Sequence, residues 1–234
     1  MDQFHSLLLS LQFKLRNRFL GRMPLRRGSP KLSSRSPDRA LYAALLQSIF
    51  REPTQQFEWI WDIGCRNWSY VESLTETFPN AKLIGVELDG NRRYWNLYRR
   101  RDVAQAYAQK IRKTKRWAEC HFSDFRAMRV GEWSGKTNLF CFFFPFVSIR
   151  PCLKWGLPKE YADFSELLSH AKMLSPNLVN IISFHQGPWE AELARKAYTQ
   201  QRMKIREIIL DQKSLNGLWV YPFAIHGISA TSTF

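Results

Sequence analysis

The stretch that decides the fold is residues 57–68, which read FEWIWDIGCRNW. Residues 57–63 form an apolar run with the length and composition of a strand that is buried on both faces. Asp62 lies near the end of this run, and Gly64 follows it. A glycine at this point favours a tight turn with exposed backbone N–H groups, which is how an open α/β sheet holds the polar part of a ligand. The stretch therefore predicts a ligand site at the end of a buried parallel strand.

Strand and helix patterns alternate outward from this stretch. Further strands are predicted at 82–87, 117–122, 138–144, 178–185, 205–210 and 218–225, and helices at 69–78, 91–112, 161–174 and 188–201. Ser36, Pro37 and Asp38 are typical of a helix start and predict one more helix, which continues through Ile49. No long helix separates the last two strands. The expected fold class is α/β: a doubly wound, Rossmann-like, mostly parallel seven-stranded sheet with an antiparallel edge strand.

The N-terminal part of the chain differs in character from the rest. Residues 1–36 are interpreted as a basic extension and linker, and residues 37–234 as one α/β domain. Apolar residues from Phe4 to Leu15 share one helical face, which predicts a short docking helix in the extension.

Composition excludes several classes of protein. The chain has 234 residues, of which 45% are hydrophobic and 15% aromatic, so disorder over most of its length is excluded. The longest apolar run, 139–147, is far shorter than the ~20 residues of a membrane-spanning helix. The four cysteines show no C-x-x-C pair, and the histidines show no ligand spacing, so we expect neither a disulfide framework nor a metal site. A reducing compartment is the default, and a cytoplasmic location is expected.

Two segments carry the excess positive charge. Residues 1–40 hold nine basic and two acidic side chains, residues 91–116 hold ten and one, and the net charge of the whole chain is +15. Segregated charge of this kind favours RNA or another polyanion as partner, while an anionic membrane surface is a weaker interpretation and a solvated surface is the plain alternative. On the helix predicted at 91–112 we expect Arg92, Arg99 and Arg100 to face outward and to bind the substrate's phosphates.

Acidic residues also end the next two predicted strands. Glu87 follows Asp62 at the distance of one helix and one strand, and Asp124 ends the strand after that. Because the carboxyl ends of parallel strands meet at one edge of the sheet, these acids are expected to lie close together. A carboxylate there can accept hydrogen bonds from two ribose hydroxyls, and another can accept from an adenine amino group, so an adenosine site is predicted.

These residues resemble the seven-stranded, class I family of S-adenosylmethionine-dependent methyltransferases over roughly residues 57–226. The resemblance implies that Asp62, Gly64 and Cys65 line the methionine end of the cofactor S-adenosylmethionine, that Glu87 binds the ribose and that Asp124 faces the adenine.

This sequence departs from the family's glycine-rich motif at two positions. Arg66 stands where the family has its second glycine, and Trp68 where it has its third. A side chain at such a position can crowd the cofactor, and Arg66 can alternatively pair with a carboxylate or phosphate of the ligand.

The segment after the fourth strand is the expected substrate side of the site. Residues 78–87, and Phe143 to Pro145, also resemble bacterial transfer-RNA guanine-7 methyltransferases, although the polar substrate residues of that family are absent here. Phe144 and Phe146 are candidates to stack on a planar substrate, whereas the preceding phenylalanines are expected to be buried in a central strand.

His185, at the end of the fifth strand, and Glu190, in the first turn of the next helix, form the one histidine and carboxylate grouping near the expected cleft. Either residue is a candidate general base; alternatively His185 caps a loop and Glu190 complements the helix dipole. The function predicted from sequence is methyl transfer from S-adenosylmethionine to an anionic substrate such as RNA. The alternative is a non-catalytic nucleic-acid-binding or assembly protein with a degenerate methyltransferase fold.

Overall fold

The computed structural model describes residues 15, 19–20, 23–26, 28–32, 37–52, 56–131, 136–219 and 222–233. The expected docking helix from Phe4 to Leu15 lies almost wholly outside these residues. The described elements are α2 (Pro37–Ile49), β1 (Trp59–Ile63), α3 (Val71–Thr77), β2 (Lys82–Val86), α4 (Arg100–Arg112), β3 (Ala118–His121), η1 (Phe125–Ala127), β4 (Asn138–Phe143), α5 (Ile149–Lys154), η2 (Lys159–Ala162), α6 (Phe164–Leu174), β5 (Leu178–Gln186), α7 (Gly187–Gln200), β6 (Lys204–Leu210) and β7 (Ile225–Thr233).

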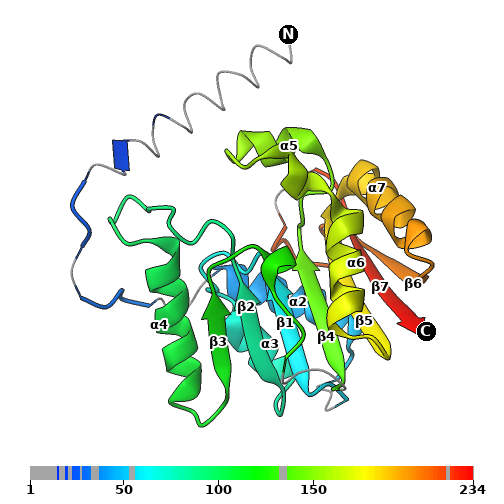
Figure 1. Ribbon diagram of the computed structural model, residues 1–234, viewed down its shortest axis with the longest axis horizontal. Coiled ribbons are helices and arrows are strands. Elements are labelled where there is room, and N and C mark those ends of the chain that lie inside the picture. The colour runs from blue at the N-terminus through cyan, green and yellow to red at the C-terminus, as the bar shows by residue number, and fades with distance from the viewer. Residues whose placement is uncertain are drawn as a thin grey trace.

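One seven-stranded sheet forms the centre of the molecule, with the order β3-β2-β1-β4-β5-β7-β6 (Figure 1). Strands β1 to β5 pair in parallel, and β7 is antiparallel to both β5 and β6. The predicted fold class is confirmed. Since the strand order reverses between β1 and β4, the carboxyl ends of these two strands mark the switch point where open α/β sheets bind ligands.

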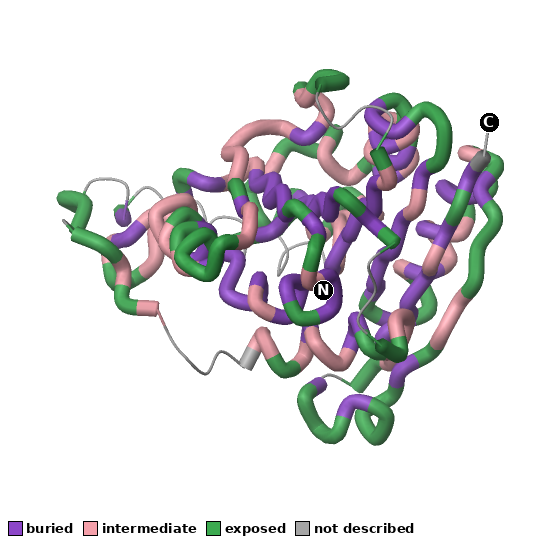
Figure 2. Tube along the Cα trace, turned by 90° about the horizontal axis from the view of Figure 1, so that it is seen from below, coloured by how far each residue is buried: buried purple, intermediate pink, exposed green. Residues whose placement is uncertain are grey.

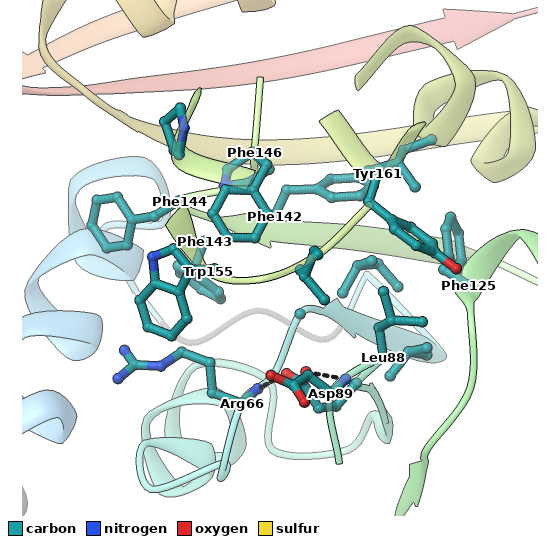
Figure 3. Close-up of a pocket in the computed structure, with 18 of the residues that line it drawn as sticks. Arg66, Leu88, Asp89, Phe125, Phe142, Phe143, Phe144, Phe146, Trp155 and Tyr161 are labelled. Carbon is teal, nitrogen blue, oxygen red and sulfur yellow. Dashed lines mark hydrogen bonds between the residues drawn. The ribbon is translucent and has the colours of Figure 1, made fainter. Parts of the chain in front are cut away.

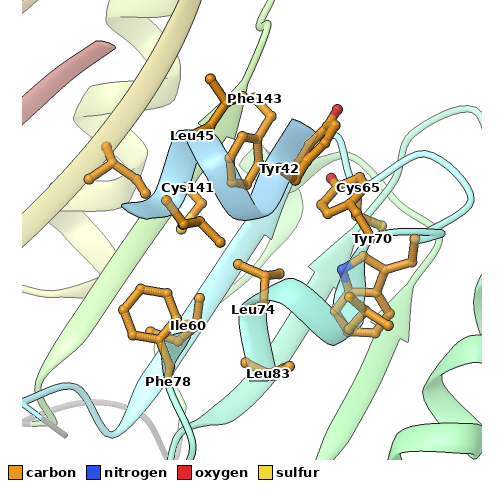
Figure 4. Close-up of a cluster of buried hydrophobic side chains, with 14 of the residues drawn as sticks. Tyr42, Leu45, Ile60, Cys65, Tyr70, Leu74, Phe78, Leu83, Cys141 and Phe143 are labelled. Atoms are coloured by element: carbon orange, nitrogen blue, oxygen red, sulfur yellow. The ribbon is translucent and has the colours of Figure 1, made fainter. Parts of the chain in front are cut away.

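Helices cover both faces of the sheet and bury two apolar layers. On one face α2, α3 and α4 pack on the strands, with Tyr42, Leu45 and Leu74 against Ile60 and Leu83 (Figure 4). On the other face η1, α6 and α7 enclose a second cluster around Trp61, Phe140, Leu168 and Tyr198. Buried residues accordingly run along the strands and the inner sides of the helices, while exposed residues lie on the outside (Figure 2). This double burial explains why the strands read as continuous apolar runs rather than alternating ones.

The helix predicted at 91–112 begins nine residues late, so the first part of that prediction is wrong. Residues 91–99 instead form a turn in which the backbone N–H of Tyr94 donates to the carbonyl of Tyr98 and Leu97 has a φ of 65°. The helix starts at Arg100 because Asp102 accepts the backbone N–H of Arg99 at 2.8 Å, which is an N-terminal capping arrangement.

The last strand also differs from its prediction. The described residues 218–219 and 222–224 of the predicted strand are not in a strand, and β7 spans Ile225–Thr233. The Trp219 indole is buried, and its Nε1 donates to the carbonyl of Phe223 at 2.7 Å. The short helix α5 carries no pattern that sequence reasoning detected.

Candidate functional site

A cavity of about 550 Å³ opens at the carboxyl ends of the parallel strands, which is where the sequence predicts a ligand. Its walls come from α2, the turns after β1 and β2, the ends of β3 and β4, α5 and the start of α7. Figure 3 shows the phenylalanine side chains of the β4 end on one side and Arg66 and Asp89 on the other.

The turn after β1 has a positive φ at all three glycine positions of the motif that the sequence resembles, although only Gly64 is a glycine. Gly64, Arg66 and Trp68 have φ values of 80°, 56° and 56°, so every second residue is in the left-handed region. For an arginine or a tryptophan this conformation costs on the order of 1–2 kcal/mol each, so the surrounding structure must stabilise it. Arg66 and Trp68 thus have a backbone conformation that ordinarily favours glycine.

Trp68 is held beneath this turn rather than in the cavity. Its indole is fully buried, and its Nε1 donates to Oδ2 of Asp62 at 2.8 Å. The hydroxyl of Tyr70 donates to Oδ1 of the same carboxyl at 3.1 Å. Burial raises the pKa of Asp62 to about 7, against the lowering effect of these two hydrogen bonds. Asp62 thus stabilises the turn through two buried hydrogen bonds.

Asp62 and Cys65, both expected to contact a cofactor, are fully buried and do not line the cavity. Cys65 instead packs with its Sγ 3.5 Å from that of Cys120. Gly85 makes this packing possible, because a Cβ there would lie 2.8 Å from the Sγ of Cys120 and 3.1 Å from the Trp68 ring. Of the predicted residues in this turn, Gly64 and Arg66 do line the cavity.

Arg66 joins the turn to the end of β2. Its backbone N–H donates to Oε2 of Glu87 at 2.8 Å, while its side chain extends along the cavity beside Tyr42 and Asp38 of α2. Sequence reasoning did not place α2 at the site, although the helix itself was predicted.

Glu87 is buried at the cavity wall and is already engaged by the protein. Its Oε1 accepts the backbone N–H of Asp89 at 2.7 Å and Nη1 of Arg100 at 3.0 Å. Asp89 in turn pairs with Arg92 at 2.5 Å, and the Arg92 guanidinium lies over the ring of Trp155 in the segment after α5. The result is a buried network of two carboxylates and two guanidiniums at one end of the cavity.

The expectation that Arg92, Arg99 and Arg100 face outward is therefore wrong for two of them. Arg92 and Arg100 are 8% and 5% exposed, because the acids at the β2 end draw them inward. Arg99 remains half-buried at the helix start, where its guanidinium pairs with Asp102 at 2.9 Å. The error arises because α4 begins at Arg100, so residues 91–99 do not have the helical faces that the prediction assumed.

Asp124 lies at the cavity wall after β3, as predicted. Its carboxylate caps η1 and pairs with Arg126, whose Nη2 is 2.8 Å from Oδ2. Although partial burial opposes it, this arginine lowers the pKa of Asp124. All three acids that line this end of the cavity, Glu87, Asp89 and Asp124, thus have an arginine partner.

Aromatic side chains also line the cavity, and several come from the end of β4. Phe144 has a φ of 56° and stacks on Trp219 with 5.5 Å between ring centroids. Phe146 lies 6.3 Å from Trp155 by the same measure. Both phenylalanines are half-buried and line the cavity; Phe142 is buried in β4, as expected, and also contributes to the lining.

Glu190 lines the cavity, but His185 does not. Oε2 of Glu190 accepts the backbone N–H of Gln186 at 2.8 Å, and burial raises the pKa of this carboxyl. His185 is fully buried in the other layer, where its Nε2 is 2.8 Å from Oγ of Ser183. Burial there lowers the pKa of His185 to about 3. The structure does not bring the two residues together in the cavity, and of the two only Glu190 lines it.

Sequence reasoning missed several lining residues. Asp89, two positions after Glu87, was visible as a second acid at a strand end. Trp219 lies in the stretch 218–225 that was predicted as a strand, so no sequence signal assigned it to the cavity.

Among the described residues no helix is long and apolar enough to cross a membrane, and no group of acidic, histidine and cysteine side chains has the arrangement of a metal site. No protein-family model and no curated protein matches the chain, so the local resemblance to transfer-RNA guanine-7 methyltransferases is not shown.

Solved structures do match. An S-adenosylmethionine-dependent methyltransferase from Aquifex aeolicus matches with a TM-score of 0.53 and 10% identity, over 85% of this chain and 99% of that one. The StiE O-MT matches with a TM-score of 0.52 and 13% identity, over 81% of this chain and 72% of that one. M. jannaschii TYW2, solved in complex with AdoMet, matches with a TM-score of 0.51 and 7% identity, over 86% and 79%. The chain therefore has the fold of class I S-adenosylmethionine-dependent methyltransferases.

Proposed function

We propose that the protein is an S-adenosylmethionine-dependent methyltransferase whose cofactor binds in the cavity at the β1 and β2 ends. The observation that carries the proposal is the charge of the cavity lining. Two arginines, Arg66 and Arg100, line it together with five acids: Asp38, Glu87, Asp89, Asp124 and Glu190. An acidic lining in a strongly basic protein suits a cationic ligand, and S-adenosylmethionine carries a sulfonium and an ammonium against one carboxylate.

The residues at each wall fit the parts of this cofactor. Glu87 keeps lone pairs for ribose hydroxyls beyond its three protein partners, and Asp124 lies at the next strand end for the adenine. Beside Gly64 a Cβ would meet nothing within 4 Å, so the backbone of the turn leaves room for a ligand at close approach. Arg66 offers a guanidinium for the methionine carboxylate.

The cofactor, when bound, supplies an activated methyl group on sulfur. The protein then needs to align an acceptor and to remove its proton. Phe144 and Phe146 offer flat apolar surfaces that orient a planar acceptor. Glu190 is the proton acceptor, because its carboxyl lines the cavity and burial raises its pKa above the ordinary value, which makes it a stronger base.

The methyl acceptor belongs to an anionic macromolecule, and RNA is the first candidate. The net charge of +15 is concentrated in the N-terminal segment and in residues 91–116, while the cavity itself is acid-rich. Charge segregated in this way attracts a polyanion to the surface around a site that holds a cation.

Calorimetric titration with S-adenosylmethionine and S-adenosylhomocysteine tests the proposal. Wild-type protein is expected to bind both, and Glu87→Gln to weaken binding by roughly tenfold to hundredfold through the lost charge-assisted hydrogen bonds. Glu58→Gln is the matched control, because Glu58 precedes β1 at the opposite edge of the sheet and is exposed. Folded wild-type protein that binds neither ligand overturns the proposal.

One observation favours the alternative of a non-catalytic protein. Glu87, Asp89 and Asp124 each have an arginine partner within the chain, so the acids of the cavity are partly neutralised without a ligand. A protein that binds RNA but not the cofactor would have this alternative function.

A further inference from the structure

The N-terminal segment lies along the turn that precedes α4. Nη1 of Arg93 donates to the carbonyl of Leu20 at 2.7 Å and also to that of Met23. The hydroxyl of Tyr98 donates to the carbonyl of Ser29 at 3.3 Å, and the Arg26 guanidinium lies over the Tyr98 ring. These contacts join the two basic stretches of the sequence into one surface, called here the strap surface and formed by residues 23–26, 28–32 and 91–101.

Three of the six described arginines of the strap surface, Arg26, Arg93 and Arg101, form no ion pair with an acidic side chain of the described residues. Arg93 is held by backbone carbonyls, Arg26 by an aromatic ring, and Arg101 lies over the ring of Phe122. In the described part of the chain no carboxylate forms an ion pair with any of these three. The other three do form ion pairs: Arg92 with Asp89, Arg99 with Asp102 and Arg100 with Glu87. A guanidinium without a carboxylate partner can bind a phosphate group through paired hydrogen bonds.

An exposed indole stands among these arginines. Trp95 is at the tip of the 91–99 turn and is 71% exposed. The turn fixes its position, since Leu97 N–H donates to the carbonyl of Tyr94 at 2.9 Å and Oδ1 of Asn96 accepts the Tyr98 N–H at 3.2 Å. A large aromatic side chain held out into solvent between cations is the arrangement that stacks on an unpaired base while phosphates bind alongside.

The strap surface continues into the cavity. Arg92, next to Arg93, donates to the carbonyl of Trp155, and Arg100 at the other end of the turn lines the cavity wall. The strap surface thus adjoins the cavity wall through Arg92 and Arg100.

We infer that the strap surface binds single-stranded RNA, with Arg26, Arg93 and Arg101 on its phosphates and Trp95 stacked on one base. The inference deepens the proposed function, since it names the substrate class and its path to the cavity, and it rests on that function for the RNA to be methylated. Bases in a duplex are stacked on each other and are not available to Trp95, so a duplex binds through phosphates alone.

Fluorescence anisotropy with a labelled oligouridylate of about 12 nucleotides tests the inference, since such a length covers one typical site. Trp95→Ala is expected to weaken binding about tenfold or more. Trp189→Ala is the matched control, because Trp189 on α7 is 69% exposed and lies outside the strap surface. Arg101→Gln is expected to make the slope of log K against log salt less steep by about 0.7, the value for one phosphate contact on a single strand.

The outcomes separate this inference from the proposed function. Equal losses in the Trp95 and Trp189 variants, or tighter binding to phosphatidylserine vesicles than to the oligonucleotide, overturn the inference. A urea unfolding curve of Trp95→Ala that overlays that of wild type shows that the variant is folded. If the oligonucleotide binds as expected but the wild-type protein binds no cofactor, the proposed function fails and the RNA surface stands.

Discussion

The pH dependence of stability should reveal the buried histidine that sequence reasoning placed in the catalytic site. His185 faces Phe164 of α6, Ser183 of its own strand, and His226 and Arg195 from the neighbouring strand and helix. None of these groups stabilises a positive charge on the imidazole. Burial, and after it the two neighbouring cationic groups, lowers the pKa of His185 from 6.5 to about 3.

The sign and size follow from linkage. Because the folded state holds the imidazole neutral, its contribution to stability is complete above the unfolded pKa of 6.5 and is lost as the pH falls toward about 3. Between about pH 7 and about pH 5 the unfolded chain gains the proton and the folded chain does not, which costs about 2 kcal/mol of unfolding free energy.

Asp62 has the opposite effect over the same range. Its carboxyl has a folded pKa raised to about 7, from 3.8 when unfolded, so the folded state gains the proton first as the pH falls. This adds about 2 kcal/mol of stability between about pH 7 and about pH 5. The two groups therefore nearly cancel in the wild-type protein, and only single substitutions separate them.

Urea unfolding of wild type, His185→Gln and Asp62→Asn at both pH values provides the measurement. The stability difference between wild type and His185→Gln should fall by about 2 kcal/mol on acidification, and that between wild type and Asp62→Asn should rise by a similar amount. Leu168→Val is the control, because Leu168 is buried on the same face of the sheet and does not titrate. The difference in unfolding free energy between wild type and this variant should be the same at both pH values. If the His185→Gln curve runs parallel to wild type at every pH, the imidazole is not held neutral and the reasoning is refuted.

Three further predictions concern the turn and the network beside it. In a double-mutant cycle, Glu87→Gln and Arg100→Met should each lower the free energy of unfolding by roughly 3 kcal/mol, because each single change leaves a buried charge unpaired. The double variant should lose much less than the sum of the two single losses, and additive losses in urea unfolding would argue against the ion pair. Trp68→Gly should destabilise by about 3 kcal/mol despite relieving the positive φ, because the lost buried indole outweighs the backbone gain; a thermal melt at or above wild type contradicts this. Gly85→Ala should cost about 1–3 kcal/mol through the 2.8 Å approach to Cys120, and adding Cys120→Ala should recover part of it; no recovery would place the clash elsewhere.

The sequence predicted the sheet because the signal for it is redundant. Strands buried on both faces read as apolar runs, and each ended near its predicted residue from β1 to β6. The positions of Gly64, Glu87 and Asp124 at the cavity follow from that alone, since the carboxyl ends of parallel strands must share one edge. What failed was local. The 91–99 turn carries arginines, tyrosines and a leucine with helical spacing, and nothing in that spacing shows that Asp102 starts the helix nine residues late.

The orientation of side chains at the site depends on contacts that no periodicity encodes. Asp62 matches the acid of a cofactor motif, yet two aromatic donors turn it into a buried support for the turn. The same contacts explain how Trp68 can stand in a glycine position. The Asp62 carboxyl accepts the indole N–H, and Gly85 on the next strand leaves space for the ring because it has no side chain. The glycine at position 85 thus compensates for the missing glycine at position 68. A motif of this kind is a requirement on backbone shape and free volume, and residues such as Trp68 can meet it when a neighbouring strand compensates.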